Sequence, residues 1–316
     1  MGPYDRRVLP ADIDAHVAAR FLTERLVGVE NVEFIGEGAW SRCFGFSFQS
    51  RELVVRFGQH LGDFEKDRKA RGWRSANLPI PEVLDVGEAL GGYFAISTRA
   101  HGVPLESLDV PGWRAVTPSL LRALDDLRTI PVAADRQFGA EDTGYFASWR
   151  ELLLSVQHDP ATSRTHGWRE RLQESERGRA VFAAGFERLD AIGHDLLVEP
   201  TMVHNDLVNR NVLVAGSVVT AIFDWGCAFA GDFLYDIATI VFWTPWYAAL
   251  GDFDLLQQAL AHWDEVGADL RGVARRLEAC ALHIGLVHIA YNAFLGDWST
   301  LDLTADRTEG YIGTSG

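Results

Sequence analysis

The chain has 316 residues, of which 47% are hydrophobic and 23% are charged, and its 29 basic and 44 acidic residues give a formal net charge of −15. This length allows a large core and suggests about two domains, while the negative charge argues against nucleic-acid binding and favours cationic ligands. The cysteines Cys43, Cys227 and Cys280 are odd in number and form no CxxC pair, which argues against a disulfide framework or a structural zinc site.

No stretch of the chain is expected to cross a membrane. Residues Met1–Pro10 lack the apolar segment of a signal peptide. Two later apolar stretches, 233–250 and 279–296, carry polar residues such as Asp236 and Asn292, whereas a membrane-spanning helix needs about 20 predominantly apolar residues. We therefore expect two buried helices and a cytoplasmic protein.

The first hundred residues predict a small antiparallel sheet with few helices. Apolar spacing indicates a helix over 12–27 and another over 64–75, and the Pro-containing segment 78–81 is incompatible with a helix interior. Short β-like runs fill the remainder. These predicted strands cover 32–35, 43–48, 53–57, 83–86 and 92–98.

After Ala100 the sequence predicts mainly helices. Helical segments are expected at 112–130, 147–157, 168–197 and roughly 233–298, with loops at 131–145 and 158–167 and a β-hairpin within 203–223. The fold class is therefore α+β, with a small N-terminal antiparallel β lobe over residues 1–99 and a larger helical C-terminal lobe over 100–316.

The strongest chemical signal is the segment His204-Asn205-Asp206-Leu207-Val208-Asn209-Arg210-Asn211, followed by Asp224-Trp225-Gly226. An apolar strand, a turn and a returning strand separate Asn211 from Asp224, so the hairpin should bring these two side chains together. The pattern corresponds to the H-R-D-x-x-x-x-N and D-F-G elements that protein kinases use for phosphoryl transfer.

These residue types suit phosphoryl transfer from a nucleoside triphosphate. Magnesium prefers hard oxygen ligands, few of them from protein, and Asn211 and Asp224 offer an amide oxygen and a carboxylate. Asp206 would orient the acceptor hydroxyl and take its proton. We interpret His204 as a structural residue that braces this loop.

A phosphate-binding element is predicted upstream. Gly36 and Gly38, with Ser41 closing the same turn, lie between two β runs, where backbone amides could approach phosphates. The next strand carries Arg56, where most kinases have lysine. Its acidic partner should lie in the following helix, either Asp67, which we favour, or Glu65.

Taken together, these motifs resemble the aminoglycoside phosphotransferase family, and within it most closely the hygromycin B 4-O-phosphotransferase type. The resemblance covers about residues 12–298. The stretches that carry it are 78–88, 96–105, 204–213, 224–225, 231–236 and 241–246.

The resemblance implies a protein-kinase-like two-lobe fold, Mg²⁺, and ATP or GTP as co-substrate. It implies that Asp206 is the catalytic carboxylate, that Asn211 and Asp224 bind the metal, and that the substrate is an aminoglycoside, so that the enzyme confers resistance. The nucleotide would contact Gly36, Gly38, Ser41, Arg56, Asp67, Ser97, Arg99 and Ala100. The acceptor would contact Asp206, Asn209, Trp243 and Trp246; core packing is the alternative role of the two tryptophans.

The charge distribution agrees with a cationic acceptor. Between Asp224 and Leu270 the chain has eight acidic residues and no lysine or arginine, although a solvated acidic face would give the same pattern. Two other functions stay open: a kinase of another small hydroxylated metabolite or a macrolide, and a pseudokinase that binds nucleotide without turnover. Retention of Asp206, Asn211 and Asp224 argues against the pseudokinase. A monomer with no membrane or nucleic-acid partner is expected.

Overall fold

A computed structural model describes residues 13–38, 40–132, 137–251 and 253–313. The chain forms two compact units, of which the first combines Met1–Ser107 with Asn209–Cys227 and the second combines Leu108–Val208 with Ala228–Gly316. The predicted division into an N-terminal nucleotide-binding lobe over 1–99 and a helical C-terminal lobe over 100–316 stays a prediction.

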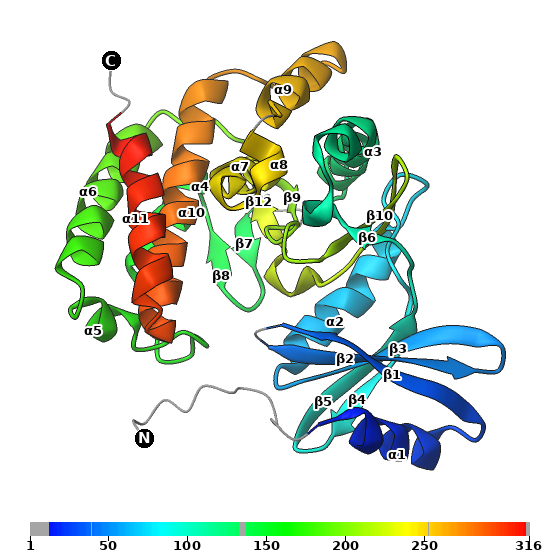
Figure 1. The fold of residues 1–316 in the computed structure, drawn as a ribbon. Coiled ribbons are helices and arrows are strands. Elements are labelled where there is room, and N and C mark those ends of the chain that lie inside the picture. Colours follow the sequence, from blue (N-terminus) through cyan, green and yellow to red (C-terminus); the bar gives the residue numbers. More distant parts are fainter. Residues whose placement is uncertain (1–12, 39, 133–136, 252, 314–316) are drawn as a thin grey trace. The chain divides into compact units, whose positions relative to one another are not determined.

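The first unit is built on a five-stranded antiparallel sheet with the order β1-β2-β3-β5-β4 (Figure 1). All five predicted strands of this region are present, most of them longer than predicted because backbone pairing extends past the apolar runs. Their bounds are β1 Val29–Glu37, β2 Ser41–Phe48, β3 Arg51–Gly58, β4 Val83–Ala89 and β5 Gly92–Thr98.

Helices cover both faces of this sheet. Helix α1 (Ala15–Arg25) begins at Asp14, whose carboxylate accepts a hydrogen bond from the Val17 amide at 2.8 Å. Alternation along β5 directs Phe94 and Ile96 into the core beneath α1 and Ala95 toward Phe64 of α2 (Leu61–Ala70). Both predicted helices are confirmed, but α2 ends at Ala70 and continues as the 3-10 turn Arg71–Trp73.

The predicted hairpin forms the second sheet of this unit. Strands β10 (Val212–Ala215) and β11 (Val218–Ile222) pair antiparallel across a turn in which Gly216 has φ of 61°. The short strand β6 (Val103–Pro104) pairs with the other edge of β10. This arrangement fixes the two residues that flank the hairpin, Asn211 and Phe223, whose backbones are joined by a 3.0 Å hydrogen bond.

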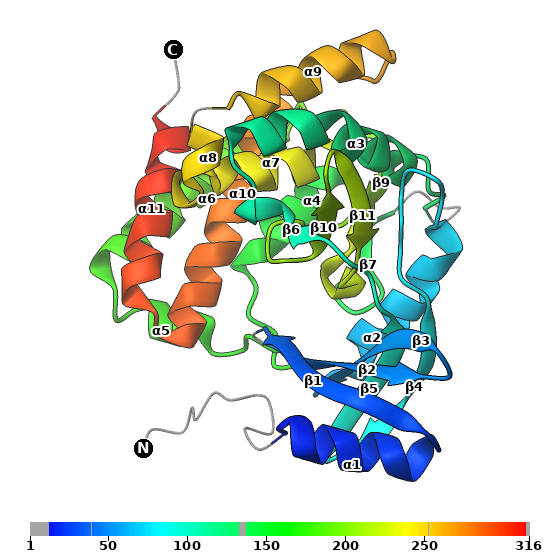
Figure 2. The same cartoon turned by 45° about the vertical axis from the view of Figure 1, so that its right-hand side comes forward.

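The second unit is mainly helical, and α6, α10 and α11 pack side by side (Figures 1 and 2). Its core includes four fully buried large side chains, Trp113, Trp149, Trp263 and Phe242. The helices are α3 Val110–Arg128, α4 Trp149–Leu154, α5 Trp168–Leu172, α6 Glu176–Gly193, α7 Leu234–Phe242, α8 Ala248–Gly251, α9 Leu255–Glu265, α10 Val273–Leu295 and α11 Trp298–Ile312.

Both apolar stretches contain a buried helix, although 233–250 is divided into α7, the 3-10 turn Thr244–Trp246 and α8. Eight of the nine residues of α7 are buried, so its apolar character reflects packing. Helix α10 is the one described helix that is long and apolar enough to cross a membrane, and 67% of its most apolar window is buried inside the unit. Burial of this extent is typical of a core helix in a globular protein.

Several elements differ from the sequence-based prediction. The helix predicted over 168–197 is interrupted at 173–175, where Ser175 caps α6 by accepting the Gly178 amide at 2.9 Å. Helix α11 extends beyond the predicted end at 298. The four-stranded sheet β8-β7-β12-β9 was not predicted, because its strands have only three residues each and show no measurable alternation. Those strands are β7 Phe138–Ala140, β8 Gly144–Phe146, β9 Thr201–Val203 and β12 Phe229–Gly231.

Candidate active site

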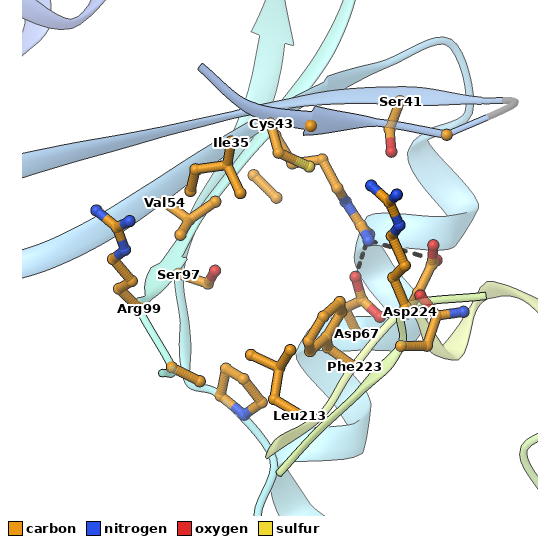
Figure 3. Close-up of a pocket in the computed structure, with 18 of the residues that line it drawn as sticks. Ile35, Ser41, Cys43, Val54, Asp67, Ser97, Arg99, Leu213, Phe223 and Asp224 are labelled. Carbon is orange, nitrogen blue, oxygen red and sulfur yellow. Dashed lines mark hydrogen bonds and ion pairs between the residues drawn. The ribbon is translucent and has the colours of Figure 1, made fainter. Parts of the chain in front are cut away.

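A cavity of about 460 Å³ lies within the first unit, between the five-stranded sheet and the β10–β11 hairpin. Figure 3 shows apolar side chains on two sides of it, Ile35 and Val54 from the sheet and Leu213 and Phe223 from the hairpin. The charged groups Arg56, Asp67 and Asp224 gather at one end. A flat apolar group could therefore lie between the walls with a charged group at the polar end.

The predicted glycine turn forms part of this wall. Gly36, Gly38 and Ser41 all line the cavity, and the Gly38 amide donates to the Ser41 carbonyl at 2.9 Å. A Cβ atom added at Gly36 or Gly38 would meet nothing within 4 Å. Protein packing therefore does not require glycine here, whereas close approach of a ligand to the backbone would.

Arg56 on β3 is held between two carboxylates. It forms an ion pair with Asp67 of α2, and its Nη1 lies 3.3 Å from Asp224 Oδ1 (Figure 3). The other carboxylate oxygen of Asp67 accepts the Trp225 amide at 2.7 Å. Of the two candidate partners, Asp67 is thus the one in contact, while Glu65 pairs with Arg68.

The charge balance of this group perturbs its titration. Burial raises the pKa of Asp67 to about 6, and the nearby Asp224 carboxylate acts in the same direction, whereas the Arg56 charge opposes it. The two carboxylates hold the pKa of Arg56 above its ordinary value despite burial. Arg56 therefore stays charged, with its charge already compensated by protein carboxylates.

The hairpin brings the two predicted metal ligands together. Val212 pairs with Ile222, and the Asn211–Phe223 backbone bond extends this ladder by one residue toward Asp224. Asp224 has φ of 65°, so its backbone turns through the left-handed region directly after the strand. Asn211 is buried, and the Asp224 side chain is 38% exposed.

This donor set fits magnesium. An amide oxygen and a carboxylate are hard ligands, and Mg²⁺ commonly takes one or two carboxylates plus phosphate oxygens and water. No group of three or more His, Cys, Asp or Glu side chains in the described residues has metal-binding geometry. Transition-metal sites built from such groups are therefore not found in that part of the chain.

Three further predicted nucleotide contacts lie at the opposite end of the cavity. Ser97, Arg99 and Ala100 all line the cavity (Figure 3 labels the first two). The Arg99 amide donates a hydrogen bond to the Glu52 carbonyl at 3.1 Å, and the Arg99 guanidinium forms an ion pair with Glu33 at 2.7 Å. The backbone hydrogen bonds among the described residues do not use the Ala100 amide, which leaves it able to donate to a ligand.

Asp206 belongs to the second unit, on the loop after β9. The buried carboxylate of Asp236 accepts the amides of His204 at 3.0 Å and Asn205 at 2.7 Å. The Asp206 amide donates to His204 Nδ1 at 3.2 Å, so His204 braces the loop as predicted. Asn205 has φ of 70°, a conformation that needs such support in a non-glycine residue.

The predicted acceptor residues are distributed over both units. Asn209 lines the cavity of the first unit. Trp243 and Trp246 are half-buried in the second unit with ring centroids 4.9 Å apart, and Trp243 also packs against the helical core. Next to them, the Tyr247 hydroxyl donates to the Val208 carbonyl at 3.0 Å. Trp243 therefore has a packing role, and its role toward an acceptor remains a prediction.

Several acidic residues of the segment 224–270 are engaged in contacts within the protein instead of forming a continuous acidic surface. Asp232 is buried in a two-bond ion pair with Arg276, and Asp236 is buried against backbone amides. Asp254 caps α9, and Asp269 pairs with Arg271. The position of a carboxylate in the sequence does not show whether it is buried, caps a helix or is exposed to solvent. Asp252 lies outside the described residues.

Two residues at the cavity, Arg210 and Glu106, were not predicted from the sequence to belong to the site. Arg210 lines the cavity, and its amide donates to a Glu106 carboxylate oxygen at 2.6 Å. Arg210 stands beside a predicted ligand and could have been noticed as a cation. Glu106 lies about a hundred positions earlier in the chain, and no local pattern marks it.

Comparison with known proteins agrees with this geometry. The model of the phosphotransferase enzyme family matches residues 32–274. Hygromycin-B 4-O-kinase from Escherichia coli is 30% identical over 280 residues, which cover 87% of this chain and 78% of the relative. The crystal structure of aminoglycoside phosphotransferase APH(4)-Ia has a TM-score of 0.80 at 27% identity and covers 96% of this chain and 100% of its own.

Two further solved structures are similar. A thermostable mutant of APH(4)-Ia, in a ternary complex with AMP-PNP and hygromycin B, has a TM-score of 0.79 at 28% identity and covers 94% of this chain and 99% of its own. Spectinomycin phosphotransferase APH(9)-Ia has a TM-score of 0.62 at 13% identity and covers 95% of this chain and 94% of its own, which shows a shared fold.

The fold and the matches define a class, the phosphoryl-transferring enzymes with a kinase-like α+β fold. Within that class, the chain belongs to the phosphotransferase enzyme family. Its recognition from sequence as an enzyme of the aminoglycoside phosphotransferase family is confirmed, as is the predicted combination of an N-terminal antiparallel sheet with a helical C-terminal part.

Proposed function

We propose that this enzyme transfers the γ-phosphoryl group of ATP or GTP to a hydroxyl of an aminoglycoside antibiotic, with hygromycin B as the acceptor. The observation that carries the nucleotide part is the cavity of the first unit, which combines apolar walls with a glycine turn and a carboxylate–amide pair at one end. Modification of the antibiotic would confer resistance, and the reaction would take place in the cytoplasm.

The nucleotide would occupy this cavity. Its base would lie between the apolar walls and accept a hydrogen bond from the Ala100 amide, while Ser97 and Arg99 line the same end. The phosphates would approach the backbone of Gly36 and Gly38 and the Ser41 hydroxyl. Magnesium, when bound, would neutralise triphosphate charge.

The pair Arg56–Asp67 and the ligands Asn211 and Asp224 would hold the charged end in place. Arg56 links the sheet to α2 and to Asp224 through its two ion pairs, so it fixes the position of the carboxylate that would bind the metal. Asn211 is held by the hairpin ladder. These residues position groups before the reaction, which is the main contribution that proteins make to phosphoryl transfer.

Asp206 would act on the acceptor. Its carboxylate would accept the proton of the acceptor hydroxyl as that oxygen bonds to the γ-phosphorus, and the bond from the γ-phosphorus to the β–γ bridging oxygen would break to release the nucleoside diphosphate. Asn209, Trp243 and Trp246 would contact the acceptor.

The choice of hygromycin B rests on relatives. The E. coli relative that spans most of the chain is a hygromycin-B 4-O-kinase, and the similar ternary complex contains hygromycin B with AMP-PNP. The net charge of −15 also favours a cationic acceptor over a neutral macrolide.

The test is nucleoside diphosphate release by the purified enzyme with Mg²⁺ and ATP or GTP, using hygromycin B, kanamycin, gentamicin and a macrolide as acceptors. Turnover with hygromycin B, absent with the others, is expected. Turnover with the macrolide alone would contradict the cationic acceptor, and nucleotide binding without turnover on any acceptor would favour the metabolite-kinase or pseudokinase function.

Two variants test the residue roles. Asp206→Ala should lower kcat about 10²- to 10⁴-fold while nucleotide affinity is retained, and activity above about a tenth of wild type would contradict the role of Asp206. Asp224→Ala should remove the magnesium dependence of nucleotide binding. Unchanged affinity for the magnesium–nucleotide complex in that variant would contradict the ligand role.

A further inference from the structure

Three arginines line the cavity of the first unit, and they differ in how their charge is compensated. Arg56 is paired with Asp67 and Asp224, and Arg99 is paired with Glu33. Arg210 has no side-chain hydrogen bond or ion pair with any described residue, although it lines the cavity. The Glu106 carboxylate attracts the charge of Arg210, but the guanidinium N–H groups of Arg210 are the ones among the cavity arginines that can still donate to a ligand.

The backbone of Arg210 is held in an unusual conformation. Its φ is 64°, in the left-handed region that is unfavourable for a non-glycine residue. Its amide donates to Glu106 Oε1 at 2.6 Å, and the adjoining residue Asn211 is buried. Glu106 itself lies in the 3-10 turn Leu105–Ser107, directly after the strand that pairs with β10. The position of Arg210 is therefore fixed by the fold.

The acidic character of the chain bears on the role of Arg210. The chain carries 15 more acidic than basic residues, so exposed arginines are readily matched by carboxylates. Arg210 lies between the cavity residues Asn209 and Asn211, and its guanidinium makes no direct hydrogen bond or ion pair with a described residue, so it is suited to bind an anion. The planar guanidinium donates two parallel hydrogen bonds to phosphate oxygens, which an ammonium group does not.

We propose that Arg210 is a further phosphate-binding residue of this enzyme, which donates hydrogen bonds to the terminal phosphates of the nucleotide while Glu106 acts as the positioning residue for its backbone. This inference rests on the proposed nucleotide-binding function of the cavity. It assigns the phosphate contact to Arg210, whereas Arg56 holds Asp224 in place.

The role predicts an effect on nucleotide affinity that grows with the number of phosphates. A hydrogen bond between charged groups corresponds to about ten- to hundredfold in affinity. Arg210→Gln should therefore weaken binding of ATP by about ten- to hundredfold and leave adenosine binding unchanged. Arg210→Lys keeps the charge but not the paired donors, and it should lie between wild type and Arg210→Gln.

The experiment is calorimetric titration of adenosine, AMP, ADP and ATP, each with Mg²⁺, into wild type and the two Arg210 variants. Arg51→Gln serves as the matched control, because Arg51 is an exposed arginine of the same unit and makes no side-chain hydrogen bond or ion pair among the described residues. Thermal unfolding of the ligand-free proteins shows whether the variants keep their fold.

The expected result is a loss confined to the phosphate-bearing ligands and to the Arg210 variants. Equal losses for adenosine and ATP, or no loss for ATP, would overturn the proposal. An unchanged ATP affinity with a raised KM for the acceptor would assign Arg210 to the acceptor instead. Nucleotide binding without aminoglycoside turnover would refute only the acceptor, whereas a wild-type protein that binds no nucleotide would refute both.

Discussion

The buried carboxylate of Asp236 offers a sharp test of how the fold supports Asp206. Asp236 lies on α7 and accepts the amides of His204 and Asn205, the two residues directly before Asp206. Asp236→Asn keeps the size of the side chain but replaces one acceptor oxygen with an NH₂ group. One buried amide would then face a donor, and Asn205 would lose support for its left-handed backbone.

Two opposing contributions set the change in the free energy of unfolding that Asp236→Asn causes. Leaving a buried amide without an acceptor costs about 1–3 kcal/mol, and a hydrogen bond to a charged group contributes about 1.5–3 kcal/mol. Against this, burial raises the pKa of Asp236 from 3.8 to about 6, with the nearby Asp206 charge acting in the same direction; a change of this size corresponds to a cost of about 3 kcal/mol for the ionised form at neutral pH. We expect Asp236→Asn to lower the free energy of unfolding by about 2 kcal/mol at pH 7.

The pH dependence of the free energy of unfolding has a sign set by the raised pKa of Asp236. A carboxyl group with a raised pKa in the folded state contributes stability that is full below pH 3.8 and is lost as the pH rises through about 6. The wild type therefore gains about 1 kcal/mol relative to the variant between pH 7 and pH 5. The destabilisation caused by Asp236→Asn should accordingly be larger at pH 5 than at pH 7.

Urea unfolding followed by tryptophan fluorescence at both pH values measures these quantities, with Asp302→Asn as the control because Asp302 is exposed on α11 of the same unit. If Asp206 has the catalytic role proposed for it, turnover should fall at least about tenfold in Asp236→Asn, since small displacements of a catalytic group are costly. A destabilisation that shrinks at pH 5, or full activity in a stable variant, would refute the reasoning.

Three other outcomes are expected. Arg276→Met, which strands the Asp232 carboxylate in the core, should lower the free energy of unfolding by about 3–5 kcal/mol, and a loss below about 1 kcal/mol in urea unfolding would contradict a buried charge pair. Glu106→Ala removes the acceptor of the Arg210 amide and should weaken ATP binding while adenosine binding is retained, as calorimetry can show. Chelation of magnesium with EDTA should weaken binding of ATP in the wild type but not in Asp224→Ala, and equal effects on both would contradict the metal site.

Local patterns in the sequence were sufficient for most of the fold. The strands of the first sheet and the β10–β11 hairpin alternate in hydrophobicity and end at turn residues, so the chain positions that form them were predictable. The short strands β7, β8, β9 and β12 were not, because three residues are too few for a period, and their pairing depends on partners far away in the chain.

The sequence by itself was enough to recognise the family, since Asp206, Asn211 and Asp224 stand at the spacings of the kinase H-R-D-x-x-x-x-N and D-F-G elements. The tertiary structure alone decided which charges are committed to the fold. It buried Asp232 and Asp236 inside the second unit, and it placed Arg210 in the cavity of the first unit without a direct ion pair to a described residue. The reason is physical: a charge is compensated through space, so its partner can lie anywhere along the chain.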